Sequence, residues 1–202
     1  EFIHENNWRG GEKLTEIIFM NKLCINSISK KPNYSFFTNG IDAEFIHENN
    51  FSKFLPTSPI IITYAGNIGE GQGLHKIIPK AASLLGDGYK FRIIGDGGAK
   101  GVLENAIKAE NVKNVVIEKP VKREQLIQIY KESHFLFMHL NDYKAFEKVL
   151  PSKVFELGAF PRPIIAGVNG YSRMFIENNV SNSILIEPTN YFELVKALQN
   201  FK

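Results

Sequence analysis

The sequence of 202 residues is poor in cysteine, in long apolar runs and in concentrated charge. Its single cysteine, Cys24, excludes an internal disulfide and a zinc site built from cysteines, and it fits a reducing cytoplasm. No apolar run is long enough to cross a bilayer, and no secretory signal is recognisable. The 24 Lys and Arg and the 21 Asp and Glu are interspersed and leave a net charge of +3, so nucleic-acid binding is not expected. We expect a globular cytoplasmic protein.

Motifs for several kinds of chemistry are also missing. The sequence has no Walker phosphate-binding loop, no Gly-x-Ser-x-Gly elbow and no cluster of histidines or carboxylates at metal-binding spacing, so no metal ion is expected. His134 and His139 flank an apolar segment, where a buried and hydrogen-bonded histidine is the ordinary interpretation. Because His139 follows that segment at its carboxyl end, a contact with a transferred group stays open as an alternative.

Apolar runs alternate with amphipathic segments from residue 60 onward, which predicts an α/β fold with a parallel sheet. The runs are continuously apolar instead of alternating with polar residues, so the strands should be buried on both faces and helices should lie on both sides. About six strands are predicted, at 60–65, 91–95, 115–118, 135–140, 163–167 and 184–188, with helices at 74–85, 100–110, 123–132, 152–160, 171–178 and 191–201.

The first part of the chain has a different pattern. One strand is predicted at 16–20 and one helix at 22–30, followed by an irregular stretch, which is too little for a domain. We interpret residues 1–58 as the tail of an N-terminal domain with a linker. The heptapeptide EFIHENN occurs in this part twice, but the flanking residues diverge at once, so it does not indicate a repeat architecture.

The segment 150–167, LPSKVFELGAFPRPIIAG, carries the strongest chemical signal. Ser152 is predicted to cap a helix by accepting a backbone N–H bond, and the start of that helix is a favourable place for an anion. Lys153 adds a positive charge there, and Glu156 follows on the same helix face, where its carboxylate could accept ribose hydroxyls. The alternative is an ordinary helix cap with a Lys–Glu surface pair, and the segment alone does not decide between them.

Glycine-rich stretches follow two of the predicted strands, at 66–73 (GNIGEGQG) and 95–101 (GDGGAKG). Such loops allow the backbone to approach a phosphate closely and present N–H groups to it. The second stretch is similar to a dinucleotide-binding fingerprint, and Glu118 lies about twenty residues further on. However, Lys100 stands where the third glycine would allow close helix packing, so an NAD-dependent enzyme is a disfavoured alternative.

Taken in order along the chain, these motifs resemble the C-terminal half of the group 1 (family 4) glycosyltransferases. The similarity is carried by FFTNGID at 36–42, YAGNIGEGQGL at 64–74, RIIGDG at 92–97 and PSKVFELGAFPRPIIAG at 151–167. The resemblance implies a Rossmann-like doubly wound parallel sheet in residues 59–202. This domain would form one half of a two-domain B-type glycosyltransferase fold.

The resemblance also implies that this half binds a nucleotide sugar, with a UDP-sugar favoured over a GDP-sugar. Lys153 and Glu156 would be the catalytic pair, with Lys153 stabilising the leaving diphosphate and Glu156 holding the ribose. The loop at 141–150 would reach the donor sugar. The other donor-binding residues implied are Gly66, Asn67, Gly69 and Gly95 in the glycine loops, Glu118, Pro120 and Val121 beside the base, and Ser152 and Val154 near the diphosphate.

The family's reaction generally retains the anomeric configuration and needs no metal ion or other cofactor. The implied acceptor is a polysaccharide or lipid-linked glycan, in bacterial surface polysaccharide synthesis. The partner would be an N-terminal acceptor domain, with peripheral contact at the inner face of the membrane, and this fragment alone would bind nucleotide without transferring sugar. A non-catalytic nucleotide-binding module is the alternative from another functional class.

The sequence departs from the family pattern in two places. Many members have a second glutamate eight positions before the ribose-binding one, whereas Lys148 stands there with Glu147 beside it. Members also often carry an arginine and a lysine for the phosphates after the first strand, where this chain has Asn67 and Gln72. Lys153 or the nearby Lys76 could replace those positive charges.

Overall fold

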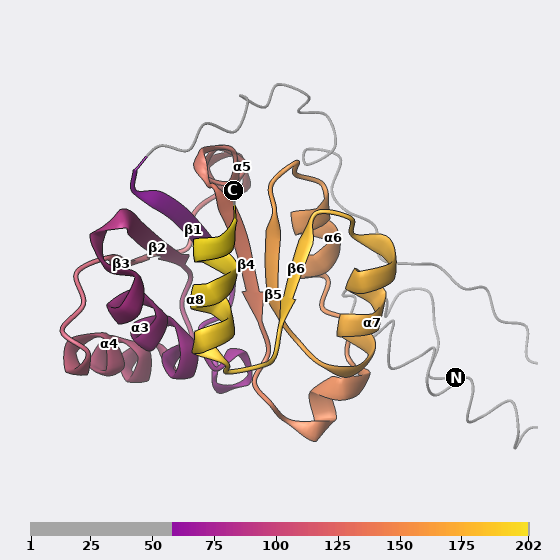
Figure 1. The fold of residues 1–202 in the computed structure, drawn as a ribbon, viewed down its shortest axis with the longest axis horizontal. Helices are drawn as coiled ribbons and strands as arrows, with labels where there is room; N and C mark the ends of the chain where they lie inside the picture. The colour runs from indigo at the N-terminus through magenta and orange to yellow at the C-terminus, as the bar shows by residue number, and fades with distance from the viewer. Residues whose placement is uncertain (1–57, 202) are drawn as a thin grey trace, which may run out of the picture.

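The computed structural model describes residues 58–201, which contain one six-stranded sheet in which every neighbouring pair of strands is parallel (Figure 1). The strand order is β3-β2-β1-β4-β5-β6, so the direction of winding reverses between β1 and β4. This confirms the predicted sheet. The strands are β1 (Ile60–Ala65), β2 (Tyr89–Ile94), β3 (Val115–Glu118), β4 (Phe135–His139), β5 (Ile164–Gly167) and β6 (Ser183–Ile186).

Helices cover both faces of the sheet, as the continuously apolar strands predict. One face packs against α3, α4 and α8, and Figure 1 shows α8 crossing in front of that face. The other face packs against α5, α6 and α7. The α-helices are α3 (Leu74–Leu85), α4 (Lys100–Ala109), α5 (Arg123–Glu132), α6 (Lys153–Gly158), α7 (Gly170–Asn179) and α8 (Tyr191–Asn200), and short 3-10 helices form η2 (Glu70–Gln72), η3 (Gly86–Gly88) and η4 (Lys144–Lys148).

Alternate residues of each central strand enter opposite halves of the core. In β4, Phe135 and Phe137 pack in the half that includes α3 and α8, while Leu136 and Met138 pack in the half that includes α5 and α6. All four side chains are at most 3% exposed. Since a fully buried large apolar side chain contributes about 1.5–3 kcal/mol, both layers of helices are needed to stabilise these strands.

The helix that carries the main sequence signal is shorter than predicted. It begins at Lys153 and ends at Gly158, not at 152–160. The predicted cap is wrong, because Ser152 has helical backbone angles (φ −56, ψ −24) and its side chain caps no N–H of α6. A capping serine needs an extended backbone so that its hydroxyl can turn back toward the first turn.

Several sequence predictions fall outside the part of the chain that the structure describes. These are the strand at 16–20, the helix at 22–30, the heptapeptide copies and almost all of the proposed 1–58 tail and linker. The loop predicted at 141–150 is described, and it contains η4. Among residues 58–201, no helix is both long enough and apolar enough to span a membrane.

Candidate functional site

A cavity of about 340 Å³ opens at the carboxyl edge of the sheet, next to the point where the winding reverses. The ends of β1 and β2 and the loop after β3 form its walls, and Lys153 approaches it from the start of α6. Ligands of doubly wound sheets bind in this location, and the volume is in the range of small-molecule sites. Among the expected donor-binding residues, those that line the cavity are Gly66, Asn67, Gly95, Pro120, Val121 and Lys153.

The two glycine loops are fitted closely together at this cavity. Gly66 N–H donates to the carbonyl of Ile94 (2.9 Å), and Gly95 N–H donates to the carbonyl of Glu118 (3.0 Å). Gly95 has φ +154, and a Cβ at this position would overlap the carbonyl oxygen of Gly66. A side chain at Gly95 would therefore push the ends of β1 and β2 apart, which explains why glycine is required there.

The Lys153 cluster, which consists of Lys153, Glu156 and Tyr130, lies beside the cavity. The Lys153 ammonium donates to Glu156 Oε1 (2.8 Å) and Oε2 (2.9 Å). The hydroxyl of Tyr130, from α5, donates to the same Oε1 (2.8 Å). The Lys153 and Glu156 side chains are only 28% and 20% exposed. The Lys–Glu pair considered as an alternative is thus present, but it is largely buried and a third residue supports it.

Burial and the neighbouring negative charge of Glu156 raise the pKa of Tyr130 well above its usual value of 10. Its hydroxyl therefore stays protonated and can act only as a donor toward the carboxylate. The positive charge that the sequence places at the start of α6 is partly neutralised by Glu156, and α6 has only six residues. The electrostatic attraction for an anion at this place consequently depends on the Lys153 ammonium more than on a helix dipole.

Four of the expected donor-binding residues do not line this cavity in the described structure, and neither does Glu156, whose carboxylate accepts from Lys153 and Tyr130 beside it. The N–H of Gly69 donates to Gln72 Oε1 (3.2 Å), which also accepts from Asn67 Nδ2 (3.0 Å) and so closes the loop on itself. Ser152 is exposed. Val154 is 2% exposed and packs in the core, so only its backbone can approach a ligand.

Glu118 is the fourth of these residues, and its carboxylate is occupied by an arginine. Arg92 donates through Nε to Glu118 Oε1 and through Nη2 to Oε2 (3.0 Å). The hydrogen bond from Arg92 to the carboxylate raises the pKa of the guanidinium. The bidentate pair joins β2 to the edge strand β3, while Pro120 and Val121, two and three residues after Glu118, turn into the cavity wall.

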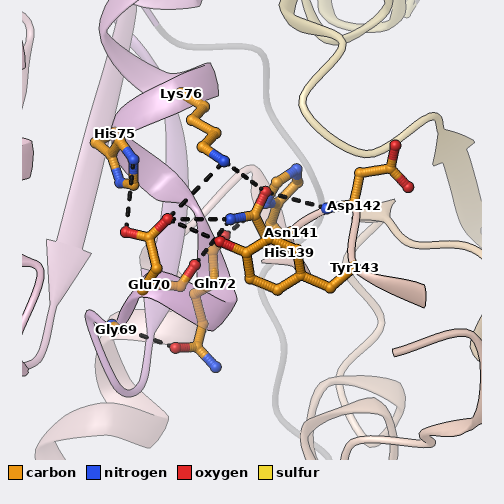
Figure 2. A network of polar contacts seen from close by, with 9 residues as sticks. All are labelled: Gly69, Glu70, Gln72, His75, Lys76, His139, Asn141, Asp142 and Tyr143. Atoms are coloured by element: carbon orange, nitrogen blue, oxygen red, sulfur yellow. Dashed lines mark hydrogen bonds and ion pairs between the residues drawn. The ribbon is translucent and has the colours of Figure 1, made fainter. Parts of the chain in front are cut away.

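A second group of polar residues, which we call the Asn141 cluster, consists of Glu70, Lys76, Asn141 and Tyr143 (Figure 2). Asn141 is 3% exposed. Its Oδ1 accepts from Lys76 Nζ (3.1 Å), and its Nδ2 donates to the backbone carbonyl of Glu70 (3.0 Å). The Tyr143 hydroxyl donates to Glu70 Oε1 (3.0 Å), and Lys76 Nζ lies 5.6 Å from the centre of the Tyr143 ring. The cluster joins the loop after β1 to the loop after β4.

From the sequence we expected the loops at 66–73 and 141–150 near the donor and named Lys76, but we did not predict that these residues contact one another. Asn141 hydrogen-bonds with residues 65 and 71 positions away in the chain, and no motif connects those positions. The only signal was indirect: both loops follow the carboxyl ends of strands, and such loops gather at one edge of a parallel sheet.

The histidines at the two ends of β4 are hydrogen-bonded and buried, so the ordinary interpretation is confirmed. His134 Nδ1 accepts from the N–H of Ile61 (2.9 Å). His139 Nδ1 lies 2.6 Å from the carbonyl oxygen of Gln72, and its Nε2 accepts from the N–H of Thr189 (2.8 Å). Burial lowers the pKa of His139 to about 4, so its ring is neutral and donates through Nδ1. Since both ring nitrogens are occupied, neither is available to a transferred group.

Comparison with known proteins identifies the family. The family model described as "Glycosyl transferases group 1" matches residues 45–202. WcaI of Escherichia coli (strain K12), described as a colanic acid biosynthesis glycosyl transferase, is 28% identical over 147 residues, which are 72% of this chain and 36% of WcaI.

Solved structures of glycosyltransferases share the fold. A complex of S. aureus TarM with Fondaparinux, alpha-GlcNAc-glycerol and UDP is similar with a TM-score of 0.63 and 19% identity, over 90% of this chain and 36% of TarM. Anabaena HepE in complex with UDP and glucose is similar with a TM-score of 0.58 and 16% identity, over 70% of this chain and 38% of HepE. The chain spans between 36% and 38% of the length of these relatives. Because the family model covers most of its length, the chain belongs to the group 1 glycosyltransferases.

Proposed function

We propose that the chain is the donor-binding half of a glycosyltransferase, and that the cavity beside Lys153 receives the diphosphate of a nucleotide sugar. The observation that carries the proposal is that one cavity brings together both glycine loops and the Lys153 ammonium. The glycines let the backbone of both loops approach a diphosphate closely, and a lysine is a charged hydrogen-bond partner for it.

The proposed chemistry follows from charge. When the glycosidic bond to the diphosphate breaks, negative charge grows on the leaving group, and a positioned ammonium stabilises it. Lys153 is the residue placed for this task. Glu156 would accept the ribose hydroxyls, Pro120 and Val121 would lie against the base, and the backbone at Gly66 and Gly95 would face the phosphates. Glu118 would act through its Arg92 pair by holding the strand ends, not by contacting the base.

The relatives support a UDP-sugar and polysaccharide synthesis. HepE is known in complexes with UDP-glucose and with UDP and glucose, and WcaI is described as acting in colanic acid biosynthesis. For this chain we propose a UDP-sugar donor, with a GDP-sugar as the second choice, and a polysaccharide or lipid-linked glycan acceptor. As the family resemblance implies, transfer would retain the anomeric configuration without a metal ion or other cofactor, in the cytoplasm or at the inner face of the membrane.

Binding of nucleotides tests the proposal directly. Calorimetric titration of the 202-residue chain with UDP, GDP and ADP should detect binding, with UDP the tightest. At one hundred times its dissociation constant, the ligand should stabilise the domain by about 2.7 kcal/mol. Lys153→Gln should weaken binding by about tenfold or more, because a charged hydrogen bond contributes about 1.5–3 kcal/mol. The matched control is Lys196→Gln, which removes the same charge from an exposed position on α8.

Absence of binding for all three nucleotides, or equal losses in the two lysine variants, would refute this assignment of the site. A turnover assay with UDP-glucose and a glycan acceptor addresses the donor-half proposal separately. Residues 1–202 alone should bind the donor without transferring sugar, because acceptor binding would need a further domain. Sugar transfer by this chain alone would contradict that part.

A further inference from the structure

Tyr130 is a completely buried residue with a polar group directed at the proposed ribose-binding carboxylate. Its relative exposure is 0%. Tyr130 lies on α5, 26 residues before Glu156, and its hydroxyl donates a hydrogen bond to Glu156 Oε1 (2.8 Å). The ring is held edge-on by Phe160, with a centroid distance of 5.0 Å and an interplanar angle of 74°. The hydroxyl therefore has a fixed position on the core side of the carboxylate.

The two donors to Glu156 differ in rigidity. Tyr130 has two side-chain torsions and is enclosed by the core, whereas Lys153 has a flexible four-carbon chain and also lines the cavity. Both donors reach Oε1, and only Lys153 reaches Oε2. A carboxylate can accept about four hydrogen bonds, so Oε2 is the oxygen with capacity for a ligand.

A diphosphate in the cavity would compete with Glu156 for the Lys153 ammonium. If Lys153 turned toward the phosphates, Glu156 would lose its bonds from the mobile donor and keep the bond from Tyr130. The carboxylate would then remain in one orientation, with Oε2 directed away from the core. This preorganisation matters because a hydrogen bond to a freely rotating carboxylate requires the loss of side-chain entropy on binding.

We infer that Tyr130 is a positioning residue that orients Glu156 and thereby sets the preference of the site for ribose over 2′-deoxyribose. The inference rests on the proposed function, since it needs a nucleotide whose ribose contacts Glu156. Tyr130 belongs to none of the motifs that indicated function in the sequence. Tyr130 touches Glu156, not the substrate, and acts through it.

The test compares nucleoside diphosphates that differ by one hydroxyl. The tightest binder among UDP, GDP and ADP is titrated alongside its 2′-deoxy counterpart. The wild-type chain should prefer the ribonucleotide by about tenfold or more, as expected for a hydrogen bond to a carboxylate. Tyr130→Phe should reduce this preference by about threefold or more, toward the value for Glu156→Gln. Affinity for inorganic pyrophosphate, which has no ribose, should stay within about twofold.

Controls separate positioning from packing. Phe160→Leu loosens the packing around the Tyr130 ring but keeps the hydroxyl, so it should lower thermal stability and preserve the ribose preference. Tyr89→Phe removes a hydroxyl from another part of the domain and should change neither binding nor preference. In a Glu156→Gln background, adding Tyr130→Phe should have no further effect on the preference.

The outcomes distinguish this inference from the proposed function. If the wild-type chain binds none of the three nucleotides, the proposed function itself fails. If it binds them and prefers ribose, but Tyr130→Phe keeps the full preference, only the positioning role is overturned. An equal loss of preference in Phe160→Leu would also overturn it, because the effect would then come from packing.

Discussion

The Lys153 cluster and the Asn141 cluster both lie at the carboxyl edge of the sheet, and each contains a lysine, a carboxylate and a tyrosine. They differ in what their polar atoms contact. In the Asn141 cluster the central amide is 3% exposed, and both of its polar atoms have partners within the domain. In the Lys153 cluster the ammonium pairs with Glu156 and also lines a cavity.

This difference shows that similar residue types can stabilise the fold in one cluster and remain able to bind a ligand in another. A cluster whose polar groups satisfy one another joins two loops and stabilises the fold. A cluster that leaves a flexible charge beside a cavity can exchange an internal partner for a ligand. We therefore expect substitutions in the Asn141 cluster to lower the free energy of unfolding, and substitutions in the Lys153 cluster to lower nucleotide affinity.

The largest expected effect comes from destroying the cavity wall. Gly95→Ala should lower the free energy of unfolding by about 3 kcal/mol or more and abolish nucleotide binding, because its Cβ would overlap the Gly66 carbonyl. Urea unfolding and calorimetric titration measure the two effects. The control is Gly98→Ala in the same loop, where a Cβ would meet no atom within 4 Å. Equal stability of the two variants would contradict the tight fit of the loops.

The next effect concerns the Asn141 cluster. Asn141→Ala should lower the free energy of unfolding by about 2–3 kcal/mol, because it removes the hydrogen bonds that the buried amide makes to Lys76, to the Glu70 carbonyl and to the N–H of Asp142. Nucleotide affinity should change by less than about threefold. Asn178→Ala, at an exposed position of α7, should change stability by about 0.5 kcal/mol or less. A large loss of affinity with unchanged stability in Asn141→Ala would reverse the roles assigned to the two clusters.

Acid should weaken the region around the Asn141 cluster through His139. Burial lowers the pKa of His139 from 6.5 to about 4, so its stabilising contribution is complete above about pH 6.5 and is lost as the pH falls toward 4. Between about pH 7 and about pH 5 this amounts to about 2 kcal/mol. Urea unfolding at the two pH values should show this loss in the wild type. His139→Gln keeps a donor and an acceptor but cannot titrate, and an undiminished loss in that variant would exclude His139 as the cause.

The smallest expected effect on stability comes from the Lys153 cluster. Lys153→Gln should lower the free energy of unfolding by about 1 kcal/mol or less, because the pair keeps some contact with solvent and a glutamine amide at position 153 can still donate to Glu156. Urea unfolding of this variant complements its titration with UDP. A destabilisation comparable with that of Asn141→Ala would show that the Lys153 cluster is chiefly structural and would remove the contrast between the two regions.

Much of the fold could be predicted because local signals agree with the tertiary arrangement. Continuously apolar runs located all six strands, and amphipathic segments located the six helices. The predicted cap of α6 was wrong because it was inferred from residue type alone. Serine often caps helices, but the backbone of Ser152 is helical and its side chain makes no capping hydrogen bond. The glycine at position 95 was identified as important, but the atom it must avoid, the Gly66 carbonyl, is on another loop.

The sequence by itself determined the alternation of strands and helices, the glycine loops and the adjacency of Lys153 and Glu156, because each depends on residues within one turn or one loop. Only the tertiary structure decided which polar groups meet. It paired Glu118 with Arg92, enclosed His139, gathered the Asn141 cluster and placed Tyr130 beneath Glu156. The physical reason is that the packing of α5 and α6 on one sheet face, and the meeting of loops at its carboxyl edge, bring together residues that no spacing in the chain relates.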